Sequence, residues 1–95
     1  MYILFTEDID KNEIIKFLEN LGFTNSRWGV NLENAEGICT CYFPTEKIKG
    51  YTLLAGDMLS NDPRISWIHN RKQVYTVEDF KNSVIENIKK WNTKE

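Results

Sequence analysis

The sequence has few of the residues on which catalytic and metal sites are usually built. Its 95 residues include one histidine, two cysteines, two prolines and five glycines. A zinc site needs about four convergent ligands, whereas His69, Cys39 and Cys41 give three at most. The sequence contains no glycine-rich phosphate loop and no HExxH or GxSxG pattern. We therefore expect a protein that is not an enzyme, with no catalytic residue, no metal and no cofactor.

The chain also lacks a long apolar run. No segment approaches the roughly 20 apolar residues that cross a bilayer, and no basic stretch leads into an apolar one as in a secretory signal. The Cys39-Thr40-Cys41 spacing is too strained for a disulfide, which favours reduced thiols. We therefore expect a cytoplasmic protein without a membrane partner.

What the sequence does contain is enough apolar material for one core. Hydrophobic residues make up 41% and aromatic residues 13%, so residues 1–95 are expected to form a single domain. The net charge of −2 argues against nucleic acid as a partner, because such binders usually present a basic surface. Residues 1–46 are acidic overall and residues 47–95 are basic, which is compatible with one basic face for an anion.

Two segments have the apolar spacing and the capping residues of amphipathic helices. Asp10 begins the first, in which apolar residues recur until Gly22, the residue type that most often ends a helix. Thr76 begins the second, in which apolar residues recur at helical spacing from Phe80 to Trp91. The spacing therefore predicts helices from Asp10 to about Leu21 and after Thr76.

The remaining apolar runs are short and β-favouring, and they predict strands. In the run 38–43, alternation puts Cys39, Cys41 and Phe43 on the expected core face. Other strands are predicted over residues 2–5, 26–30, 51–54, 65–69 and 73–75, the last two as a hairpin. The order of elements predicts an α+β fold: a small antiparallel or mixed sheet of four to five strands, with two helices packed on one face.

Cationic and planar side chains alternate across the predicted hairpin. Guanidinium groups bind phosphate bidentately and aromatic rings stack on bases, so this segment is a candidate site for a partner protein or an anionic small molecule. The same pattern also fits a hairpin with an aromatic residue in the core and a charged, soluble turn. Both interpretations stay open for the residues concerned, which are Arg64, Trp67, His69, Arg71 and Lys72.

A second candidate surface surrounds Trp28, which lies in a polar stretch without core periodicity. Arginine and aromatic side chains are enriched at the energetic centres of protein interfaces. Arg27 and Trp28 are therefore candidates for contacts with a partner or a second copy of the chain. The alternative is that Trp28 closes one end of the core.

The pattern of Leu-Gly-Phe at 21–23, Trp-Gly at 28–29, Pro44, Trp67 and Tyr-Thr-Val-Glu-Asp-Phe at 75–80 resembles small accessory proteins of bacteriophages and prophages. The resemblance implies a non-catalytic protein of the infected cell that binds and blocks a host protein, for example one of an anti-phage defence system. The alternative is a homo-oligomer that sequesters a nucleotide or another anionic signalling molecule.

Overall fold

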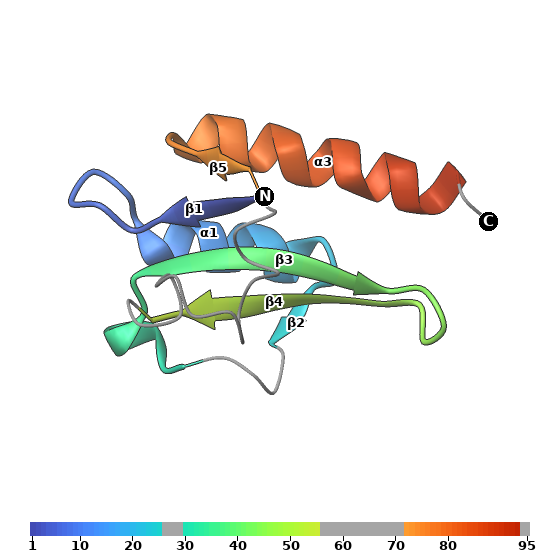
Figure 1. The fold of residues 1–95 in the computed structure, drawn as a ribbon, viewed down its shortest axis with the longest axis horizontal. Helices are drawn as coiled ribbons and strands as arrows, with labels where there is room; N and C mark the ends of the chain where they lie inside the picture. The colour runs from blue at the N-terminus through green and yellow to red at the C-terminus, as the bar shows by residue number, and fades with distance from the viewer. Residues whose placement is uncertain (26–29, 56–71, 94–95) are drawn as a thin grey trace.

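The computed structural model describes residues 1–25, 30–55 and 72–93 (Figure 1). Within these residues, five strands form one mixed sheet in the order β2-β4-β3-β1-β5, accompanied by two α-helices. This arrangement confirms the predicted α+β class. The elements are β1 (Tyr2–Leu4), α1 (Lys11–Asn20), β2 (Thr24–Asn25), the short 3-10 helix η1 (Leu32–Asn34), β3 (Gly37–Phe43), β4 (Ile48–Leu54), β5 (Gln73–Val74) and α3 (Val77–Thr93).

Both helices pack on the same face of the sheet, as predicted. Helix α1 buries Ile14 and Leu18 completely, and α3 does the same with Phe80 and Val84. Because these four side chains form one cluster with residues of β1, β3, β4 and β5, the two helices share a single core. The sheet residues of the cluster are Ile3, Ile38, Tyr51, Leu53 and Val74.

The ends of both helices follow the predicted capping chemistry. The Asp10 carboxylate accepts a hydrogen bond from the Asn12 backbone N–H at 3.0 Å, which satisfies one of the free N–H groups of the first turn. Gly22 follows α1 with a φ of +89°, a left-handed conformation that glycine adopts without strain. At α3, the Thr76 hydroxyl accepts from the Asp79 N–H at 3.1 Å.

The predicted core face of β3 was wrong. Tyr42 stacks on Trp91 of α3, with ring centroids 4.9 Å apart, and Ile38 belongs to the core cluster. The helices therefore cover the face opposite to that of Cys39 and Phe43, and Phe43 is 45% exposed. Cys39 is nevertheless buried. Since the first half of β3 is buried on both faces, alternation of apolar residues could not indicate which face the helices cover.

The strands predicted over residues 2–5, 51–54 and 73–75 are present, but their first or last residues differ from the prediction. Strand β4 begins three residues before the predicted start, at Ile48, because Phe43 and Ile48 already oppose each other in the β3–β4 ladder. Strand β5 pairs in parallel with β1. Residues 26–29 and the predicted strand over 65–69 lie outside the described residues, so the predicted hairpin is not tested.

Two lysines connect α1 to its neighbours. Lys11 Nζ donates to the carbonyl oxygens of Leu32 at 3.2 Å and Ala35 at 3.1 Å, which ties η1 to the start of α1. A cation is electrostatically unfavourable at a helix N-terminus, so these hydrogen bonds explain its position. From α3, Lys81 Nζ forms an ion pair with the Glu13 carboxylate at 3.0 Å. This pair lies on the side of α3 that faces α1.

A tyrosine in the core makes stability sensitive to alkaline pH. Burial raises the pKa of Tyr51 above its ordinary value of 10.0, and the nearby Glu19 carboxylate raises it further. The unfolded chain therefore releases the phenolic proton at a lower pH than the folded protein, so folding stability should fall as the pH rises above about 10. We expect Tyr51→Phe to flatten this fall in urea titrations between pH 8 and 11.

The control for this experiment is Ile14→Val, which should lower stability at every pH without changing the slope. Wild-type and Tyr51→Phe curves that stay parallel above pH 10 would contradict the expectation.

Candidate functional site: a groove between β5 and α3

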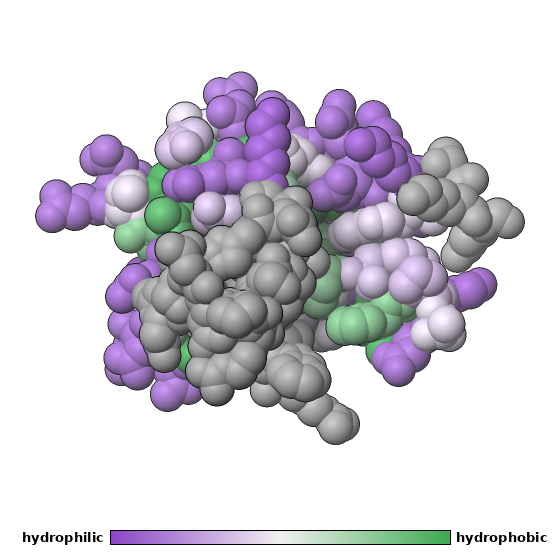
Figure 2. Space-filling view, in the orientation of Figure 1, coloured by the Kyte–Doolittle hydropathy of each residue, from purple (hydrophilic) through white to green (hydrophobic). Residues whose placement is uncertain are grey.

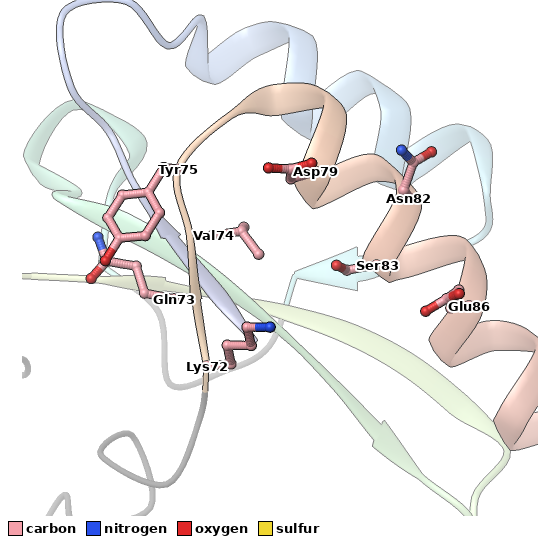
Figure 3. A pocket seen from close by; sticks show the side chains of 8 residues that line it. All are labelled: Lys72, Gln73, Val74, Tyr75, Asp79, Asn82, Ser83 and Glu86. Atoms are coloured by element: carbon pink, nitrogen blue, oxygen red, sulfur yellow. The ribbon is translucent and has the colours of Figure 1, made fainter.

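An open groove of about 430 Å³ lies between the edge strand β5 and one flank of α3 (Figure 3). One wall comes from β5 and the residues next to it, and the other comes from polar side chains of the first half of α3. The close-up shows the Asp79, Ser83 and Glu86 side chains directed toward the β5 side. The lining residues are Lys72, Gln73, Val74, Tyr75, Asp79, Asn82, Ser83 and Glu86.

The helical wall of the groove results from the spacing of polar residues along α3. Asp79, Asn82, Ser83 and Glu86 follow each other at i, i+3, i+4 and i+7, so they form one stripe along the helix. This stripe borders the core stripe of buried residues. Lys81 lies on the opposite side of the core stripe and faces α1. The polar stripe therefore lies on the flank of α3 that points away from α1.

The strand wall is placed by a very short connection. Strand β5 ends at Val74 and α3 begins at Val77, with the capping residue Thr76 between them. The chain thus turns directly from the sheet edge into the helix, which puts both walls of the groove next to each other. Across the ladder, the Tyr2 hydroxyl donates to Gln73 Oε1 at 3.4 Å. This contact helps to hold β5 against β1.

The groove carries charges of both signs and an exposed aromatic ring. Asp79 and Glu86 contribute two carboxylates, and Lys72 contributes one ammonium group; all three residues are exposed. In the described part of the chain, neither carboxylate has an ion-pair partner. Tyr75 is 74% exposed. The groove therefore favours a cationic or polar ligand with some apolar surface over an anion.

The lining is polar and partly charged, and it contains no histidine or cysteine. The lining residues include no histidine that could activate the Ser83 hydroxyl as a nucleophile, and their one lysine is the exposed Lys72. Across the described ranges, no three histidine, cysteine or acidic residues gather as a metal site would require. Hydrogen bonds, charge and an aromatic contact are what these side chains offer.

Hydrophobic side chains gather on a different part of the surface. Figure 2 shows polar side chains over α3 and, near the free end of the β3–β4 hairpin, a small hydrophobic area next to polar side chains. Phe43 and Ile48 oppose each other there and are 45% and 43% exposed. Because this pair lies at a protruding turn and brings no polar group that could orient a ligand, the β5–α3 groove is the stronger candidate site.

Sequence reasoning found one residue of the groove. Lys72 was predicted as a binding residue, and it lines the groove next to β5. The other predicted binding residues lie outside the described residues, so the structure does not place them; these are Arg27, Trp28, Arg64, Trp67, His69 and Arg71. Tyr75 and the polar stripe of α3 were missed. The polar residues of the stripe recur at i, i+3, i+4 and i+7, one residue away from the core residues of the same helix. This spacing could have indicated a polar stripe along α3.

Comparisons with known proteins assign this chain to no family and to no function. No family model, no curated protein and no solved structure matches this chain. In the part of the chain that the structure describes, no helix is long and apolar enough to span a membrane.

Proposed function

We propose that this chain is a non-catalytic binding protein that acts on another protein through the β5–α3 groove. The observation that carries the proposal is the convergence of the edge strand of the described sheet, an exposed tyrosine and two carboxylates that have no ion-pair partner among the described residues around one groove. Tyrosine is enriched at interface centres, and charged groups around such a centre select and orient the partner. The lining residues include no histidine and no cysteine.

The nature of the target comes from the sequence. The resemblance to phage accessory proteins favours a host protein as the target, including a protein of an anti-phage defence system. Binding would then inhibit the target by covering part of its surface. This target class is a prediction of the sequence pattern, and the groove provides the surface on which it can be tested.

The alternative function, capture of a nucleotide or another anion by an oligomer, receives no support from the groove. Its lining carries two carboxylates against one ammonium group, and carboxylates repel phosphates. Lys72 is the one predicted anion-binding residue among the described ones. The others, Arg64, His69 and Arg71, lie outside them, so the anion hypothesis stays a prediction for that segment.

A comparative pull-down tests the proposal. The wild-type protein and the double variant Tyr75→Ala/Glu86→Lys are immobilised and exposed to a lysate of the cell in which the gene is expressed. We expect at least one protein to be retained about tenfold more by the wild type, because loss of an aromatic anchor and reversal of a charge each weaken an interface.

The matched control is Glu78→Lys. Glu78 lies on the same helix and is exposed, but it does not line the groove. It should retain the same protein as the wild type, and thermal unfolding confirms that all three proteins are folded. If every captured protein is retained equally by the wild type and the double variant, the groove is not the binding surface and the proposal fails.

A further inference from the structure

We propose that the groove accepts an extended, basic segment of the partner, which adds to the sheet as a further strand beside β5. This inference rests on the proposed function, because it specifies which part of a partner the groove binds. Strand addition at a sheet edge is a common way to bind an extended peptide, and main-chain hydrogen bonds then supply much of the affinity. Three features of the groove support it: the direction of the β5 backbone, the position of the acidic stripe and the exposure of Tyr75.

The first feature is the backbone of β5. The Tyr2 N–H donates to the Lys72 carbonyl oxygen at 2.9 Å, and Tyr2 pairs with Gln73 in the parallel ladder. In this pattern the backbone groups of Lys72 and Val74 point toward β1, and those of Gln73 point the other way. Strand β5 is the edge of the described sheet, and the Gln73 N–H and carbonyl meet no backbone partner among the described residues. The predicted hairpin of 65–69 with 73–75 would use this same edge, so strand addition and that hairpin exclude each other.

The second feature is the stripe of α3 above that edge. An added strand would lie about 4.8 Å from β5, and every second side chain would face the helix. Asp79 and Glu86 are seven residues apart, which is about 10.5 Å along the helix axis. Basic side chains on alternate residues of one added strand can therefore reach both carboxylates, and Asn82 and Ser83 offer polar contacts between them.

The third feature is the tyrosine at the end of β5. Tyr75 is the most exposed of the large hydrophobic side chains in the described residues, at 74%. Figure 3 shows its ring beside Gln73, on the side of β5 away from the α3 side chains, where it can pack on a residue of the added strand that faces away from the helix. The occupant that satisfies all three features is an extended segment with basic residues at the alternate positions that face α3.

Amide spectroscopy of the whole protein tests the inference directly. The probe is an acetylated and amidated octapeptide in which threonine and lysine alternate, and the comparison peptide alternates threonine and glutamate. In the free protein we expect the Gln73 amide to exchange with solvent faster than the Val74 amide, which faces β1. Addition of the lysine peptide should shift the Gln73 and Tyr75 amide signals and slow exchange at Gln73, whereas the glutamate peptide should not.

Two pairs of variants separate the backbone contribution from the charge contribution. Gln73→Pro removes the outward N–H without touching the ladder bonds of Lys72 and Val74, and should weaken binding of the lysine peptide about tenfold. Gln73→Val loses the same side-chain hydrogen bond to Tyr2 but keeps the N–H, so the difference in affinity between Gln73→Pro and Gln73→Val measures the backbone contribution. Glu86→Lys should weaken binding several-fold, less so at high salt, and Glu78→Lys should leave it unchanged.

The possible outcomes distinguish the two proposals. Slow exchange at Gln73 in the free protein, no shift with the lysine peptide at millimolar concentration, or equal shifts with both peptides would overturn strand addition. In that case, a captured protein that is lost with Tyr75→Ala/Glu86→Lys would still support the proposed function. If no captured protein depends on the groove, the proposed function fails, whatever the peptides do.

Discussion

Replacement of Phe80 by alanine should lower the free energy of unfolding by about 3–5 kcal/mol, the range found for truncation of a large buried aromatic side chain. Phe80 has no exposed surface and belongs to the cluster that joins both helices to the sheet. The cost combines the apolar area that is lost and the cavity that remains. Urea unfolding followed by circular dichroism measures it.

Ile85→Ala is the matched control for Phe80→Ala. Ile85 lies on the same helix but is 40% exposed, so its truncation should cost less than about 1 kcal/mol. Since a domain of this size is stable by about 5–15 kcal/mol in total, Phe80→Ala could fail to fold. Phe80→Leu then provides the milder measurement, and an effect no larger than that of Ile85→Ala would contradict the central place of Phe80 in the core.

Gly37→Ala should cost about 1–3 kcal/mol, the usual range for a forced contact in a packed region. Gly37 pairs with Leu4 in the β1–β3 ladder. A Cβ at this position would lie 2.8 Å from the Ile3 carbonyl oxygen and 3.1 Å from Leu4 Cδ2. The closer of these contacts is with backbone, so β1 itself would have to move, and β1 holds β5 and with it one wall of the groove.

A second substitution shows which contact causes the loss. In the double variant Gly37→Ala/Leu4→Ala the side-chain contact disappears and the contact with the backbone oxygen remains. We therefore expect Leu4→Ala to restore little of the stability that Gly37→Ala removes, as measured by a double-mutant cycle. Full restoration would show that the Leu4 side chain, and not the approach of the β1 backbone, requires glycine at position 37.

Local chemistry made much of the fold predictable. Asp10, Gly22 and Thr76 mark helix ends through contacts within a few residues of the chain, and all three predictions were confirmed. The pairing of β5 with β1 was not predictable in this way. It joins Tyr2 to Gln73, and no local preference encodes a partner so distant in sequence; packing of α3 on the sheet determines it.

The candidate site was less predictable than the fold. Sequence reasoning concentrated on cationic and aromatic residues, and among the described ones it identified Lys72. The groove also needs Asp79 and Glu86, which look like ordinary solvated residues in the sequence. They become a wall because the core stripe of α3 fixes the rotation of the helix and the short turn at Thr76 brings the helix next to β5. Both conditions depend on tertiary structure.

The parallel pairing of β1 with β5 also constrains how the molecule assembles. Strands β3 and β4 are joined by a tight turn and can meet early, whereas β1 and β5 close a loop of about 70 residues, which costs considerably more chain entropy. Pairing of β1 with β5 therefore comes after the β3–β4 hairpin can already have formed. The groove needs β5 and the first half of α3 in place, so its formation depends on this later step.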